Sequence, residues 1–240
     1  MPPRALLLSL REPQDLMVAH EARCFTRAAR LRPEDLVTHS AHSPRPTVGE
    51  LRAFDAIFFG GSGAFGVYDD LPWIRNGLRV ITEVIDAGVP AFASCFGFQG
   101  LAQVLGGEVT HDPATTEMGS TRVALTEAGR RDPLFSFLPP QLWVQEGHHD
   151  RVTRVPPGVI TLASSALCPE QAFRVEGAPF WASQFHPELS LRGTLDRFEH
   201  YASHYLEDTA ALERLREHLA QGLETPEVSE LLARVARGQF

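Results

Sequence analysis

The chain has 240 residues, a formal net charge of −8 at neutral pH and 43% hydrophobic residues, which is the composition of a globular protein that buries most of its apolar surface. The negative charge argues against a nucleic-acid-binding surface, and no apolar run reaches the roughly 20 residues that span a bilayer. Three widely spaced cysteines predict neither a disulfide framework nor a zinc pattern. We therefore expect a cytoplasmic protein with no cofactor.

The first part of the chain alternates apolar runs with amphipathic segments. It predicts strands at 5–10, 36–38, 54–59 and 89–94, and helices at 14–31, 70–88 and 97–105. Pro72 and Gly88 mark the start and the end of the second of these helices. This alternation of strands and helices is typical of an α/β domain with a parallel sheet.

From about residue 107 the segments are shorter and are broken by Pro and Gly. Strands that would extend or flank the main sheet are expected at 109–110, 122–125, 142–145, 159–163, 172–175 and 180–185. An amphipathic helix follows at 195–205, and further apolar stripes lie at 212–219 and 228–235, the last after a capped start at Thr225-Pro226. We expect one domain at 1–206 and a helical C-terminal extension at 207–240.

Cys95 ends an apolar run and is followed by small residues and a helical stretch. A sharp turn from strand to helix exposes a side chain and directs the first N–H groups of the helix at it, which favours a thiolate. Far downstream, His186-Pro187-Glu188 places a base two residues before a carboxylate that can orient it. In an extended segment both side chains share one face. These residues predict a cysteine nucleophile with a histidine base.

Several blocks, in this order, resemble class I (triad-type) glutamine amidotransferase domains. They are the turn at Cys95, the glycine-rich segment 59–63, Glu117-Met118-Gly119, the segment 147–152 and His186-Pro187-Glu188. The 147–152 block looks closest to the glutaminase domain of GMP synthase. The resemblance implies a doubly wound α/β fold with a mixed, mostly parallel sheet. Ala93 stands where the family's turn has a glycine, which predicts strain there.

The resemblance also implies the role of each residue. Cys95 would attack the side-chain amide of glutamine and form a thioester, with His186 as the base and Glu188 as its orienting carboxylate. The backbone N–H groups of Gly61 and Phe96 would stabilise the oxyanion. Glutamine would be held by Gly63, Gln99, His148, His149 and Asp150.

A metal ion is the rival interpretation of His148-His149-Asp150. Adjacent residues of a strand point to opposite faces, so only His148 and Asp150 would converge, and the sequence offers no further ligand beside them. We therefore expect no metal.

Three functions remain open. In the first, the chain hydrolyses glutamine and delivers ammonia to a partner synthase in trans, because the sequence has no ATP-binding block of its own. In the second, it is a stand-alone γ-glutamyl hydrolase or peptidase. In the third, it is a degenerate, non-catalytic fold that acts as a binding module. The C-terminal stripes would dock on the chain's own domain, in a homodimer or on the synthase.

Overall fold

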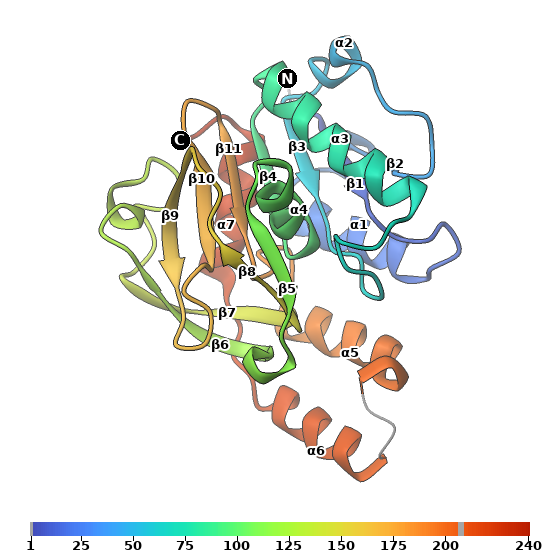
Figure 1. Ribbon diagram of the computed structural model, residues 1–240, viewed down its shortest axis with the longest axis vertical. Helices are drawn as coiled ribbons and strands as arrows, with labels where there is room; N and C mark the ends of the chain where they lie inside the picture. The colour runs from blue at the N-terminus through green and yellow to red at the C-terminus, as the bar shows by residue number, and fades with distance from the viewer. Residues whose placement is uncertain (1, 206–208) are drawn as a thin grey trace.

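The computed structural model describes residues 2–205 and 209–240, which form a nine-stranded sheet with helices on both faces (Figure 1). The strand order is β2-β1-β3-β4-β11-β10-β9-β6-β7. The five strands of the parallel half are β2 (Leu36–Ser40), β1 (Ala5–Ser9), β3 (Ala56–Phe59), β4 (Ala91–Ser94) and β11 (Phe180–Ser183). The predicted α/β fold with a mixed, mostly parallel sheet is confirmed.

The other half of the sheet is antiparallel. It consists of β10 (Ala172–Val175), β9 (Val159–Ser164), β6 (Glu117–Leu125) and β7 (Gln141–His148). The strands β6 and β7 are longer than the sequence predicted, because they pair continuously from Glu117↔His148 to Ala124↔Gln141. A separate two-stranded ladder joins β5 (Glu108–His111) to β8 (Asp150–Arg154).

Side chains alternate between two cores along the central strands. Leu7 of β1 packs in the core that includes Phe25 of α1 (Met17–Ala28), whereas Leu6 and Leu8 pack in the core that includes Ile74 of α3 (Pro72–Ala87). The helix α4 (Phe96–Val104) shares the second core. Because strand side chains alternate with a period of 2, each apolar strand serves both layers.

The C-terminal helices are α5 (Leu191–Tyr205), α6 (Thr209–Ala220) and α7 (Pro226–Ala236). The predicted boundary between 206 and 207 lies outside the described residues. Leu231 and Leu232 of α7 are fully buried in the same core as β1, β3 and β4, so this helix packs on the chain's own sheet. The predicted cap at Thr225 is wrong in detail, since its side chain makes no capping hydrogen bond and Pro226 begins the helix.

Short helical turns occupy some connections. They are η1 (Pro33–Asp35), α2 (Val48–Leu51), η2 (Pro113–Thr115) and η3 (Gly129–Arg131). The sequence analysis missed α2, although Thr47 and Glu50 form a capping box at its start. Within the described ranges, no helix is both long and apolar enough to cross a membrane.

Candidate active site

A cavity of about 330 Å³ opens at the carboxyl ends of the parallel strands. Arg11 follows β1, Gly61 follows β3, Cys95 follows β4 and His186 follows β11, and all four residues line the cavity. The volume lies within the range of small-molecule sites, and the carboxyl edge of a parallel sheet is where α/β proteins bind ligands. The topology thus brings together residues that are far apart in the sequence.

Cys95 occupies the predicted sharp turn between β4 and α4. Its backbone has φ 52° and ψ −107°, and Arg30 is the only other non-glycine residue with positive φ in the described part of the chain. A Cβ on Gly97 would lie 2.8 Å from Phe59 Cβ, so the turn needs a glycine at that position. Ala93 instead pairs regularly within the sheet with Phe59 and Ala182, so the backbone strain lies at Cys95 itself.

The thiol of Cys95 is not acidified by its surroundings. Burial raises its pKa to about 12, and the carboxylates of Glu146 and Glu188 add to that effect. Arg197 and the N–H of Phe96 act in the opposite direction without offsetting it. The expected thiolate is therefore wrong for this structure, because the turn's N–H groups compete with desolvation and two carboxylates.

His186 and Glu188 form the predicted pair. Nδ1 of His186 lies 2.8 Å from Oε1 of Glu188, and both side chains are buried. Burial lowers the pKa of His186, which keeps the ring neutral near pH 7 although Glu188 opposes this. Burial alone would raise the pKa of Glu188, but His186 and Arg197 hold it at about 2. Nδ1 of His186 also lies 3.1 Å from Nη1 of Arg197, which can only donate. Because the ionised Glu188 is the nearer partner, we assign the Nδ1 proton to the bond with Glu188, which leaves Nε2 as the basic atom.

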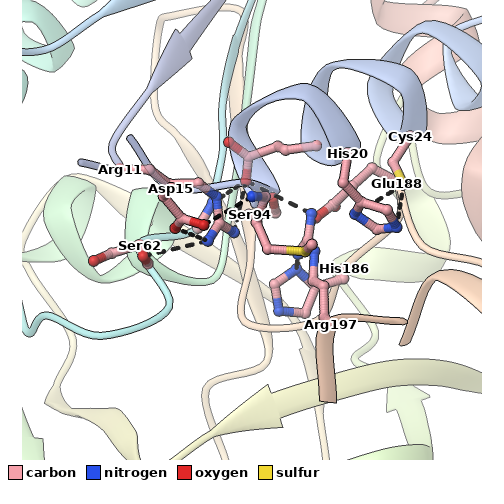
Figure 2. Close-up of polar contacts among 12 residues, drawn as sticks. Arg11, Asp15, His20, Cys24, Ser62, Ser94, His186, Glu188 and Arg197 are labelled. Atoms are coloured by element: carbon pink, nitrogen blue, oxygen red, sulfur yellow. Dashed lines mark hydrogen bonds and ion pairs between the residues drawn. The ribbon is translucent and has the colours of Figure 1, made fainter. Parts of the chain in front are cut away.

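Arg197 of α5 lies against both His186 and Glu188 (Figure 2), and it also contacts a second buried carboxylate. Its Nη1 lies 3.0 Å from Oε1 of Glu188, and its Nη2 lies 3.6 Å from Oε1 of Glu21. Glu21 also accepts a hydrogen bond of 3.1 Å from Arg11. Arg197 is thus shared between Glu188 and the α1 carboxylate of Glu21, which Arg11 also contacts, and burial makes each contact electrostatically strong.

The glycine-rich segment after β3 wraps around these side chains. The N–H of Gly61, predicted as an oxyanion donor, donates to Oε1 of Glu21 at 3.1 Å. A Cβ on Gly60 would lie 2.5 Å from the carboxylate of Glu21, and one on Gly63 would lie 2.5 Å from the ring of Tyr201. Here the glycines allow close approach of the protein's own side chains.

The other predicted glutamine contacts also line the cavity, but most of their polar atoms already have partners. Nε2 of Gln99 donates to the carbonyl of Asp150 at 3.0 Å. The carboxylate of Asp150 binds His111 at 2.7 Å, and His149 binds Thr116 at 2.8 Å.

His148 does not share a ligand position with the Asp150 side chain. Nδ1 of His148 contacts the carbonyl of Asp150 at 2.9 Å, and its Nε2 points at Glu117. The expected convergence of the two side chains is therefore wrong. The strand breaks between β7 and β8 at His149, so the alternation of faces does not continue through it.

Four charged residues at the site were missing from the sequence analysis: Arg11, Glu21, Glu146 and Arg197. Two signals could have indicated them. Arg11 comes directly after a buried strand, at the edge where ligands bind. Glu21 lies on the same helix face as Cys24 and Phe25, so its carboxylate belongs to an apolar stripe.

The comparisons with known proteins agree with this geometry. The family model described as "Glutamine amidotransferase class-I" matches residues 28–198, so the chain belongs to that family. The chain is 38% identical over 133 residues to a GMP synthase [glutamine-hydrolyzing] of Lactobacillus delbrueckii, a match that covers 55% of this chain and 24% of the relative. It thus matches about a quarter of that relative's length.

Shorter relatives match over more of their length. A chain named as one subunit of a GMP synthase [glutamine-hydrolyzing] from Saccharolobus solfataricus is 34% identical over 146 residues, which cover 61% of this chain and 73% of the relative. Among solved structures, a glutamine amidotransferase from Thermotoga maritima has a TM-score of 0.70 at 21% identity, with 98% of this chain and 97% of that chain covered. At this identity the structural match shows the fold alone.

Proposed function

We propose that the protein hydrolyses the side-chain amide of glutamine through a thioester on Cys95. The observation that carries the proposal is the strained turn at Cys95, which lines the same cavity as His186, whose ring is bound to the buried Glu188. A nucleophile, a base and a residue that orients the base are the parts that acyl transfer from an amide needs.

The charge states suggest how the first proton moves. Cys95 starts as a neutral thiol and His186 as a neutral imidazole, so Nε2 takes the thiol proton as the sulfur attacks the amide carbon. The imidazolium then protonates the departing ammonia, and the neutral ring activates the water that cleaves the thioester. Glu188 stays ionised and stabilises the imidazolium, because its pKa is held at about 2.

The oxyanion of the tetrahedral intermediate needs preorganised donors. The N–H of Phe96, at the start of α4, already lies against the Cys95 thiol. The N–H of Gly61 is bound to Glu21, so a second donor from this segment would require a change in that contact. Loss of one oxyanion donor typically costs about 10²–10³ in rate.

The named relatives support a partner for the reaction. The matched chains from Saccharolobus solfataricus and Sulfolobus acidocaldarius are each named as one subunit of a GMP synthase, which implies a further subunit in those proteins. We propose that ammonia passes from the Cys95 cavity to a synthase on another polypeptide.

A latent or non-catalytic site is a second candidate function. Two observations favour it, namely the raised pKa of Cys95 and the capture of the Gly61 N–H by Glu21. In this version the cavity binds a γ-glutamyl ligand without turnover until a partner changes the site.

A glutamate-release assay distinguishes the two. The purified chain is incubated with glutamine, and glutamate is measured with and without the synthase subunit of a GMP synthase. Hydrolysis that disappears in Cys95→Ser supports the glutaminase, and hydrolysis that appears only with the added synthase supports the latent site. Glutamate release that persists in Cys95→Ser would overturn both.

A further inference from the structure

A second polar cluster lies on the antiparallel side of the cavity. Glu117 starts β6, His148 ends β7, and Cys168 lies in the loop between β9 and β10. One ligand atom from each residue, the carboxylate oxygen, the imidazole nitrogen and the sulfur, lies within 4.8 Å of the other two. All three residues are buried. Segments that are distant in the sequence thus bring three metal-ligating groups to one point.

The cluster has more acceptors than donors. Glu146 is 1% exposed, and neither of its carboxylate oxygens accepts a hydrogen bond of good geometry among the described residues; the nearby amide of Gln171 donates to Glu117 instead. Its Oε2 lies 3.6 Å from Nε2 of His148. Oε1 of Gln171, a fully buried residue of the same cluster, also has no partner there. Burying an acceptor that receives no hydrogen bond lowers the stability of the fold, and a cation bound beside these atoms would remove that cost.

His148 is held in the tautomer that such a cation needs. A carbonyl oxygen can only accept, so the 2.9 Å contact with Asp150 places a proton on Nδ1 of His148. In the neutral ring Nε2 is then a lone pair, and it faces Oε2 of Glu117 at 3.3 Å and Oε2 of Glu146 at 3.6 Å. A backbone carbonyl that fixes one imidazole nitrogen is the usual support for a ligand at the other.

We propose that Glu117, His148, Cys168 and Glu146 bind a divalent zinc-class metal ion. Tetrahedral zinc with bonds of about 2.0–2.3 Å to nitrogen, oxygen and sulfur has ligand–ligand edges of roughly 3.3–3.7 Å. The two edges from His148, 3.3 Å and 3.6 Å, match this geometry, whereas Glu146 lies outside the group of three mutually close ligands, so its carboxylate moves inward when the ion binds. The thiol of Cys168 moves inward and loses its proton to solvent as the Zn–S bond forms.

Neighbouring residues orient one of the ligands, and the cavity gives an ion access to the cluster. Nε2 of Gln171 donates to Oε2 of Glu117 at 2.5 Å, which orients that carboxylate. Glu146 and His148 line the cavity, so an ion reaches the cluster from the same opening as a small molecule. Once bound, it would tie β6, β7 and the β9–β10 loop together beside Cys95.

Metal uptake by the full-length chain tests the proposal. Cys95→Ser serves as the background for every sample, because the catalytic thiol and His186 could also hold zinc. The protein is stripped with a chelator, and Zn²⁺ is returned in competition with a chromophoric chelator. We expect one equivalent per chain, with binding weakened at least about 10–100-fold by Cys168→Ser or Glu146→Gln. Cys24→Ser, which changes another buried cysteine outside the cluster, should bind as tightly as the background.

Cobalt gives a second signal that does not depend on glutamine hydrolysis. Co²⁺ bound by a thiolate shows a sulfur-to-metal charge-transfer band, which should be lost in Cys168→Ser and kept in Cys24→Ser. Far-UV circular dichroism confirms that each variant is folded, and Glu146→Gln keeps the shape of the side chain it replaces. Absence of uptake would mean that a proton, and no metal, satisfies Glu146. The proposal is overturned if no zinc is taken up. It is also overturned if zinc is taken up but neither Cys168→Ser nor Glu146→Gln weakens its binding.

Discussion

Two buried histidine–glutamate pairs meet at one cavity, which is lined by His186 of the first pair and by His148 and Glu146 of the second, and they differ in what balances the charge of their carboxylates. On the parallel side, Glu188 contacts both His186 and Arg197, and its pKa is held at about 2. On the antiparallel side, burial and the nearby Glu117 raise the pKa of Glu146 well above its usual range. Among the described residues, the Gln171 amide lowers this pKa without offsetting the rise, and no cation contributes.

One fold thus contains two kinds of polar site, a pair whose charges the chain itself balances and a cluster whose charges it does not. The pair on the parallel side is completed by Arg197 of α5, which contacts both His186 and Glu188, so its charge states are fixed by the chain itself. The cluster on the antiparallel side has acceptors that only an added proton or ion can satisfy. We therefore expect the first side to carry chemistry and the second to respond to ions.

The largest expected effect is at the nucleophile and base. Cys95→Ala should abolish glutamine hydrolysis, and His186→Ala should lower kcat by about 10²–10⁴-fold, because each proton transfer is lost. Steady-state glutamate release measures both. Cys24→Ala changes a buried cysteine that does not line the cavity, so it is the matched control and should keep most of the activity. Comparable loss in the control would show that folding, and not chemistry, was tested.

A core substitution tests whether α7 belongs to the same domain as the site. Leu232 is fully buried, and Leu232→Ala should lower the free energy of unfolding by about 2–5 kcal/mol. Leu223 is 46% exposed and is the matched control. Leu223→Ala should change the free energy of unfolding by about 0.5 kcal/mol or less. Chemical denaturation measures both. An unchanged stability in Leu232→Ala would place α7 outside the folded unit.

The ionised Glu188 predicts an acid-dependent stability. Its folded pKa of about 2 lies below the ordinary value of 4.5, so its stabilisation is present above pH 4.5 and is lost as the pH falls toward 2. The shift corresponds to on the order of 3 kcal/mol. Unfolding curves of wild type and Glu188→Gln across this window isolate the effect, because the amide does not titrate. If the stabilities of wild type and Glu188→Gln changed with pH in the same way across this window, Glu188 would not be held ionised by its neighbours.

Arg197 should have a smaller, pH-dependent effect. It lowers the pKa of both His186 and Glu188, so Arg197→Gln should raise the pKa of the base. The base must be neutral to act, and activity is lost as the pH falls through its pKa. The acid limb of the pH profile of kcat/KM should therefore move to higher pH. Near neutrality, kcat/KM should fall by about 10–100-fold, because a charged hydrogen bond contributes about 1–3 kcal/mol.

Arg197→Lys is the control for this prediction. It retains a positive charge and should restore most of the acid limb, although a point charge cannot bridge Glu188 and Glu21 as the guanidinium does. A loss of activity with no shift of the acid limb in either variant would assign Arg197 to packing alone.

The sequence predicted the parallel half, the turn at Cys95 and the His186–Glu188 pair well, because each depends mainly on neighbouring residues. Apolar runs mark β1, β3 and β4, the turn at Cys95 needs only its neighbours, and the H-x-E spacing places His186 and Glu188 on one face. The length of β6 and β7 could not be predicted so well. These two strands are extended by pairing with each other across a long connection, which the local sequence does not reveal.

The electrostatics of the site could not be predicted from the sequence. The arginines and Glu21 meet through contacts between α1, α5 and the glycine-rich segment, and the sequence alone does not bring these elements together. The same is true of Glu117 and Cys168, whose neighbourhood follows from strand order. The thiolate prediction was wrong because it considered the helix N-terminus and omitted the burial and carboxylates that the fold supplies.

The central claim is that Cys95 carries the γ-glutamyl group during turnover. The most direct test is acid quenching of the chain during reaction with glutamine, with the synthase subunit of a GMP synthase added as the proposed partner, followed by mass spectrometry of the chain's cysteine peptides. We predict a γ-glutamyl adduct on the Cys95 peptide and none on those of Cys24 and Cys168. Steady glutamate release with no adduct on Cys95, or an adduct on another cysteine, would contradict the account.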